Sequence, residues 1–253
     1  MNNRFLSVII SVGITSILIF IIVIAYNSLS TSDSSSSMLR IMTLLGGNMP
    51  LGLIQAFTFF LFFYAMIEIS GIFKELRFHE KAFAKNLLPE KDNWVLSPND
   101  VAQLKLDVMA YEKREKSMLS RLIIMVCGKY RTNKSTSEAM ELLSAQIKIN
   151  RENDESSQSL IRYVIWAIPS VGFIGTVIGI AQSLGAVKQN MSGDDLVNVT
   201  SALNVAFDTT LVALFLSLIM MFFYHRLQER QERLHSKTEQ YILENLINRI
   251  YHS

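Results

Sequence analysis

Residues 167–184, AIPSVGFIGTVIGIAQSL, are the stretch of sequence that decides the fold. Within this apolar segment, small and hydroxyl-bearing side chains recur at intervals of four, three and four positions: Gly172, Thr176, Gly179 and Ser183. Residues three and four apart lie on the same face of an α-helix, so the spacing predicts a helix with one narrow face of small residues. A second helix could pack closely against such a face, because nothing on it is larger than threonine.

A second apolar segment, residues 202–224, repeats the same spacing: Ala206, Thr210, Ala213 and Ser217. Only residues 185–201 separate the two segments, which predicts antiparallel neighbouring helices. We expect the two small faces to meet and to carry the hydroxyls of Thr176 and Thr210 at equivalent points. A threonine in a membrane helix commonly bonds back to a carbonyl of its own helix, and the matched placement of the pair argues against that simpler interpretation.

The composition indicates a membrane protein. Of 253 residues, 50% are hydrophobic and only 18% are charged, which is unusual for a soluble domain of this length. The formal net charge of +2 is too small for a nucleic-acid-binding protein. The single Cys127 cannot form an internal disulfide, and no Cys/His cluster has metal-ligand spacing, so we expect no cofactor. We also expect no enzymatic activity, since no nucleophile and base converge and no phosphate-binding loop is present.

Four apolar segments are near the length of about 20 residues that a helix needs to cross a membrane. They predict an all-α membrane protein with four transmembrane helices and a helical cytoplasmic extension, the helices being residues 1–26, 51–73, 161–187 and 202–224. The first segment has an alternative interpretation as a cleaved signal peptide, because Arg4 precedes its apolar run. Its run of about twenty residues exceeds the roughly 7 to 15 typical of signal peptides, which favours a retained helix.

The distribution of Lys and Arg predicts the orientation. Residues 74–160 contain 15 basic residues, whereas the connection 27–50 contains only Arg40 and the turn 188–201 only Lys188. Positively charged connections stay in the cytoplasm, which places residues 74–160, the tail 225–253 and both termini inside. Both weakly charged connections are then periplasmic, and the Ser-rich run in residues 27–50 predicts a flexible linker.

The cytoplasmic segments are expected to be helical. Residues 101–129 and 137–150 carry apolar side chains at intervals of three and four, and Ser97 to Asp100 has the pattern of a helix start. The charged residues 112–116 fit a solvated helix face better than a docking site. The tail predicts an amphipathic helix that continues the fourth transmembrane helix.

Two ionisable residues, Glu68 and Asp208, lie within the predicted transmembrane helices. Glu68 is close to the cytoplasmic end of its helix, where a structural role is the simpler interpretation. Asp208 points about 200° away from Thr210 on a helix, with Thr209 between them, and cannot share a face with the threonine pair. It could guard the outer mouth of a pathway or pair with a neighbouring helix.

At these residues the chain resembles the MotA, TolQ and ExbB family of bacterial inner-membrane ion-conducting motor subunits. The similarity lies in residues 167–180, AIPSVGFIGTVIGI, with a Pro, a Gly, Gly-Thr-Val and a further Gly. It continues in residues 206–214, AFDTTLVAL, where Ala213 replaces the usual Gly. The resemblance implies pore-helix packing positions at Pro169, Gly172, Gly175, Gly179, Ser183, Ala206, Ala213 and Ser217, and an ion pathway at Thr176, Thr210, Thr209 and Asp208.

The resemblance further implies a homopentamer in the inner membrane whose third and fourth helices line a pore. Two copies of a single-span partner of the MotB, TolR or ExbD kind would occupy the pore, and an Asp of the partner would carry H⁺ or Na⁺. Ion flow would rotate the pentamer about the partner. Two other functions stay open on the sequence: a structural membrane scaffold that uses the small faces only for packing, and a small secondary transporter.

Overall fold

The computed structural model describes residues 2–31, 36–48, 52–90, 95–187 and 193–250. Within these residues the secondary structure is helical, which confirms the all-α prediction: α1 (Asn2–Thr31), α2 (Ser36–Leu44), α3 (Leu53–Lys81), η1 (Ala82–Lys85), α4 (Pro98–Glu112), α5 (Met118–Asn133), α6 (Thr136–Ser157), α7 (Ser159–Gly185), α8 (Gly193–Asn245) and η2 (Ile247–Arg249). Four of the described helices are long and apolar enough to cross a membrane. Each of the four predicted transmembrane segments falls mainly within one of them: α1, α3, α7 and α8.

The chain divides into two compact units. The first, called the membrane unit here, comprises Met1–Ser70 and Ser159–His225. The second, called the extension unit, comprises Gly71–Gln158 and Arg226–Ser253. Helices α3 and α8 contribute residues to both units. Helix α8 runs without a break from the fourth predicted transmembrane segment into the tail, so the expected tail helix is present.

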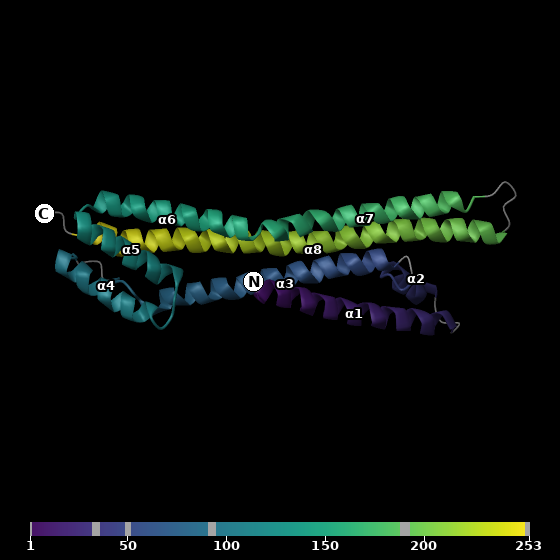
Figure 1. The fold of residues 1–253 in the computed structure, drawn as a ribbon, viewed down its shortest axis with the longest axis horizontal. Coiled ribbons are helices and arrows are strands. Elements are labelled where there is room, and N and C mark those ends of the chain that lie inside the picture. Colours follow the sequence, from purple (N-terminus) through teal and green to yellow (C-terminus); the bar gives the residue numbers. More distant parts are fainter. Residues whose placement is uncertain (1, 32–35, 49–51, 91–94, 188–192, 251–253) are drawn as a thin grey trace. The chain divides into compact units, whose positions relative to one another are not determined.

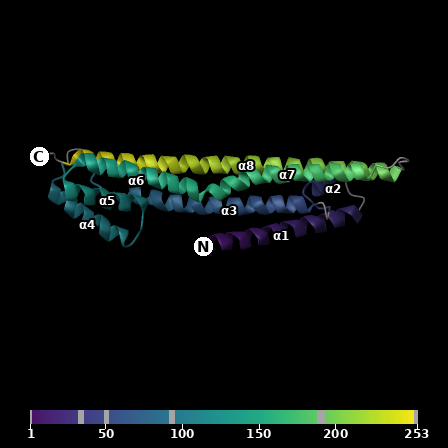
Figure 2. The same ribbon diagram turned by 45° about the horizontal axis from the view of Figure 1, so that its top comes forward.

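In the membrane unit, α7 and α8 run side by side in opposite directions (Figures 1 and 2). Large apolar side chains cover the outward faces of these helices, among them Phe173, Leu184 and Leu218, each about two-thirds exposed. On α1, Ser11 and Thr15 point inward, and their hydroxyls donate to carbonyls one turn earlier on the same helix. An apolar exterior over satisfied polar groups suits a hydrocarbon environment, where an unpaired polar group is costly.

The extension unit has an ordinary hydrophobic core. Helices α4, α5 and α6 and the end of α8 bury a continuous apolar cluster that includes Val101, Val108, Leu122, Ile123, Val126, Leu143, Ile147 and Ile242. The predicted helix start at Ser97 is confirmed: its hydroxyl accepts from the Asp100 amide, and the Asp100 carboxylate accepts from the Ser97 amide. Such reciprocal capping satisfies two amide groups that the first helical turn leaves unpaired.

The charged residues 112–116 do not form a helix face, contrary to the sequence-based expectation. Helix α4 ends at Glu112 and α5 begins at Met118, so most of the cluster lies in a turn. Ser117 explains the break, because its side chain and that of Ser120 form a capping box that starts a new helix. The charged run also has no apolar side chain to bury.

Both predicted periplasmic connections are more helical than expected. The linker 27–50 contains the last turns of α1 and all of α2, where Leu39 and Met42 lie three apart and are partly buried. Residues 193–201 of the expected turn belong to α8. Residues 32–35, 49, 50 and 188–192 of these two connections lie outside the described residues.

Chemical labelling of Cys127 tests whether the core of the extension unit is packed. Its side chain is fully buried in α5, and burial raises the pKa of the thiol to about 12. At pH 8 only about one thiol in ten thousand would be ionised, and the thiolate is the reactive form. We expect a maleimide or iodoacetamide reagent to leave the folded protein unlabelled and to label it once the unit unfolds, as measured by intact mass. Rapid labelling of the folded protein would contradict this packing.

Candidate functional site

The small faces of α7 and α8 meet, as the spacing predicts. A Cβ atom built on Gly172 would lie 2.5 Å from the Ala213 Cβ, and one built on Gly179 would lie 2.6 Å from the Ala206 Cβ. A Cβ on Gly175 would lie 2.5 Å from the Thr209 Oγ1. These separations are far below van der Waals contact, so the backbones approach as closely as they do only because glycine stands at all three positions.

The hydroxyls of Thr176 and Thr210 link the two helices. Thr210 Oγ1 donates to the Gly172 carbonyl at 2.9 Å, and Thr176 Oγ1 lies 3.1 Å from the Ala206 carbonyl. The two hydroxyls also contact each other. Both residues are half-buried. The bonds therefore run mainly across the helix pair, since the contact of Thr176 with a carbonyl of its own helix is longer, at 3.4 Å.

Thr209 occupies a different environment from its neighbour. Its side chain is 1% exposed and packs against Gly175. Its hydroxyl donates to the Ala206 carbonyl of its own helix at 2.9 Å. Within the single chain, Thr209 fills the space between the helices, and its place in an ion pathway stays a prediction.

The other predicted packing residues lie along the same helix pair. Ser183 and Ser217 are buried, and Ser183 Oγ donates to the Val199 carbonyl of α8 at 3.2 Å. Pro169 stands inside α7, one turn before Gly172, where its ring removes a helix hydrogen bond.

Asp208 pairs with a neighbouring helix, which was one of the two alternatives that the sequence left open. Its side chain is 2% exposed, and Arg40 of α2 contacts both carboxylate oxygens, with Nη2 2.7 Å from Oδ1 and Nη1 on Oδ2. Such a bidentate arrangement satisfies a buried carboxylate far better than a single contact does. Arg40 was missed as a site residue, although the sequence marks it as the sole basic residue of residues 27–50.

The structure also describes Glu68 and the acidic, His and Cys side chains that could bind a metal. Glu68 is half-buried on α3. Among the described residues, no group of three or more His, Cys, Asp or Glu side chains could hold a metal ion. The polar chemistry of the membrane unit thus centres on the threonine pair and the Arg40–Asp208 ion pair.

Comparison with known families identifies the chain. Residues 110–240, just over half of its 253, match the model of the MotA/TolQ/ExbB proton channel family. The chain belongs to this family. No curated protein and no solved structure gave a significant match.

The matched region of this MotA/TolQ/ExbB member contains α7 and the membrane part of α8 in full. It therefore includes every residue of the threonine pair and of the small faces, together with Asp208. Helices α1, α2 and α3 lie outside the match. Family membership and the four apolar helices together make the chain a multi-pass membrane protein of a proton channel family.

Proposed function

We propose that the chain is the ion-channel subunit of a rotary motor driven by an ion gradient, and that the ion is a proton. Five copies would surround an axis lined by α7 and α8, as in the family it resembles. The observation that carries the proposal is the pair of half-buried threonines, whose hydroxyls contact each other across the two helices. Each threonine is half-buried in the single chain, so part of each residue is left to face a shared axis.

The chemistry of threonine requires a second component. A hydroxyl can donate to and accept from water, but it cannot take up a proton near pH 7. We therefore propose that two copies of a single-span MotB, TolR or ExbD-like partner stand on the axis and supply the carboxylate that carries the ion. Each elementary charge that crosses a potential of 100 mV releases about 2.3 kcal/mol, which is enough to bias a small rotational step.

The basic residues of 74–160 and of the tail support a cytoplasmic extension unit. We propose that the protein resides in the bacterial inner membrane with both termini in the cytoplasm. Residues 27–50 with helix α2, and the connection before α8, would then face the periplasm.

The proposal predicts that the double substitution Thr176→Val and Thr210→Val stops ion flow without preventing assembly. Valine keeps the shape of threonine and removes the hydroxyl, so the helices should still pack, with a loss of about 1 kcal/mol per lost hydrogen bond. Proton flux into vesicles that contain the assembled complex should fall at least about tenfold. Thr200→Val is the matched control, because Thr200 is an exposed threonine of α8 whose hydroxyl bonds back to Leu196.

The same measurement separates the proposed motor subunit from a structural scaffold. A structural scaffold would keep its assembly and its cellular activity in the double variant, since the hydroxyls would serve packing alone. Unchanged flux in the double variant would overturn the proposed pathway, and flux driven by a sodium gradient alone would overturn the choice of the proton.

A further inference from the structure

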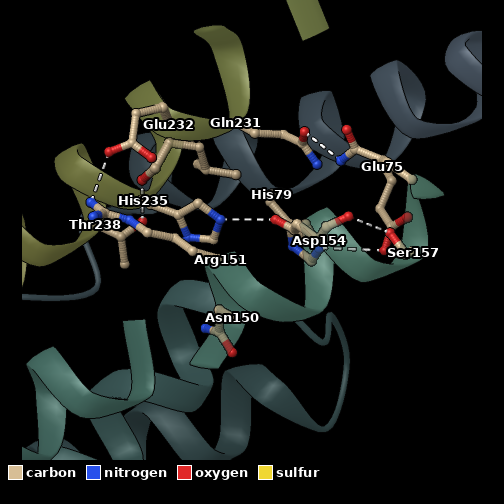
Figure 3. Close-up of polar contacts among 12 residues, drawn as sticks. Glu75, His79, Asn150, Arg151, Asp154, Ser157, Gln231, Glu232, His235 and Thr238 are labelled. Atoms are coloured by element: carbon tan, nitrogen blue, oxygen red, sulfur yellow. Dashed lines mark hydrogen bonds and ion pairs between the residues drawn. The ribbon is translucent and has the colours of Figure 1, made fainter. Parts of the chain in front are cut away.

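The extension unit holds a buried histidine–carboxylate pair. His235 of α8 is 3% exposed, and its Nε2 lies 2.8 Å from the Oδ2 atom of Asp154 on α6 (Figure 3). The other ring nitrogen, Nδ1, is also buried and has no hydrogen-bond partner. An orphaned nitrogen on a buried imidazole calls for an explanation, because an unpaired buried polar atom is costly.

A second orphaned atom lies on the same helix as Asp154. Arg151 stands about one turn earlier on α6, and its Nη2 forms an ion pair with Glu232 Oε1 at 2.9 Å (Figure 3). Its Nε is buried and has no partner. Among the described residues only three buried side-chain atoms are unpaired in this way, the third being Gln55 Oε1 in the membrane unit.

Both orphaned side chains line one small cavity of about 160 Å³. Its wall also includes Gln158 and Gln231, which bond to each other at 2.6 Å. A larger cavity of about 380 Å³ is lined in part by His235 and Asp154 as well. The Asp154–His235 pair therefore belongs to the walls of both cavities.

The charges around the cavities favour water as their occupant. The small cavity is faced by one basic side chain, Arg151, and by three acidic ones: Asp154, Glu155 and Glu232. This excess of acidic groups disfavours an anion. The larger cavity is balanced, with the charged groups Glu75, Lys116, Arg121 and Asp154 and with His79. Both walls offer hydrogen-bond donors and acceptors, and each volume is well above the roughly 10 to 15 Å³ that one water needs, which are the conditions under which ordered water is held.

We propose that Asp154 and His235 form a proton relay between water in the two cavities. The inference rests on the proposed function with the proton as the transported ion. At rest, one water of the small cavity accepts from the Arg151 Nε–H and donates to the His235 Nδ1. The imidazole then carries its proton on Nε2 and donates it to Asp154, because each ring nitrogen takes the role that its partner requires.

In the transfer step, the His235–Asp154 pair takes up one proton from the small cavity and releases one proton to the larger cavity. A protonated water of the small cavity gives a proton to Nδ1, and the N–H bond at Nε2 breaks as its proton passes to Asp154 Oδ2. Asp154 then releases that proton to water in the larger cavity. The neutral imidazole is left with its hydrogen on Nδ1. Nδ1 returns that proton to water of the small cavity, and Nε2 takes one up from the same water through Asp154, which lines this cavity as well. The site then ends with the protons and charge with which it began, and one proton has moved to the larger cavity.

The position of the relay in the sequence suits proton release on the cytoplasmic side. Gln158 directly precedes α7, and His235 follows the fourth predicted transmembrane segment, which ends at residue 224. Along the chain, the relay residues thus lie shortly before α7 and shortly after the predicted membrane segment of α8, the two segments that carry the threonine pair.

The resting arrangement is tested by nitrogen NMR of the full-length protein labelled with ¹⁵N-histidine. The chain has four histidines, and the His235→Gln variant identifies the signal of His235. We expect the hydrogen on Nε2 and an accepting Nδ1 in slow contact with water. A hydrogen on Nδ1 at rest, or an Nδ1 without water contact, would overturn the relay. This readout is independent of ion flow.

The transfer step is tested by proton flux through the assembled complex in proteoliposomes. His235→Gln and Asp154→Asn should each lower the flux about tenfold or more while the complex still assembles. His225→Gln is the control, since His225 lines neither cavity. Wild-type flux in His235→Gln, together with lost flux in the Thr176 and Thr210 double variant, would overturn the relay and leave the proposed function standing. Wild-type flux in all of these variants would overturn both.

Discussion

Replacing Gly179 by valine is expected to separate α7 from α8 and to destabilise the membrane unit. A Cβ at this position would lie 2.6 Å from the Ala206 Cβ and 2.9 Å from both the Ala202 carbonyl oxygen and the Ala206 Cα. These neighbours belong to or adjoin the backbone of α8, so relief requires movement of the whole helix. Overpacking of this kind costs about 1 to 3 kcal/mol, and we expect the upper end of that range.

The measurement is the melting temperature of the purified protein in detergent, with a decrease of about 6 to 12 °C for the valine variant. Gly71→Val is the matched control, because Gly71 also lies inside a helix and a Cβ built there has nothing within 4 Å. An equal decrease in both variants would indicate a general effect of valine for glycine. A stable Gly179→Val variant would contradict close packing at this point.

Replacing Arg40 by alanine is expected to destabilise the membrane unit about as much as Gly179→Val does. The reason here is electrostatic. Asp208 is 2% exposed, and Arg40 is the partner that balances its charge. Removing one member of a buried ion pair typically costs 3 to 5 kcal/mol, because it leaves an uncompensated buried charge. The half-exposed position of Arg40 reduces this, and we expect about 2 to 4 kcal/mol.

A double variant tests whether the loss of stability comes from the unpaired charge of Asp208 or from lost side-chain packing. In Arg40→Leu with Asp208→Leu no buried charge is left, and stability should return close to that of the wild type. Arg114→Ala is the control, since Arg114 is exposed in the turn between α4 and α5. The melting temperature in detergent is again the readout, and an Arg40→Ala variant as stable as the Arg114→Ala control would show that the ion pair contributes nothing.

The sequence predicted the helix pair well because one simple regularity controls it. Glycine, alanine and threonine at intervals of four, three and four leave a single face on which two helices can pack, and the short connection fixes their direction. The prediction that Asp208 faces away from Thr210 follows from the same geometry. The likeness to MotA, TolQ and ExbB rests on these residues, and the family match includes them.

Other features depend on partners that are distant in the sequence. Arg40 and Asp208 are 168 residues apart, and no local pattern links them. Thr209 differs from Thr210 by one helical step of 100°, which buries one side chain and leaves the other half-buried. The polar cavities combine residues of α3, α5, α6 and α8, so only the folded chain brings them together.

The sequence-based predictions also missed one short helix and one break between helices. Helix α2 follows a serine-rich run whose composition indicates a linker, and its few apolar side chains gain their helical order from packing. The turn at residues 113–117 depends on one capping serine inside a stretch with helical spacing. In both places a local contact outweighs the average composition.

The most direct test of the account is the structure of the complete assembly extracted from membranes with its partner. We predict five copies of the chain around an axis, with the Thr176 and Thr210 hydroxyls turned toward that axis and toward a carboxylate of the partner. An isolated chain without a central opening, or threonines that face lipid, would contradict the account.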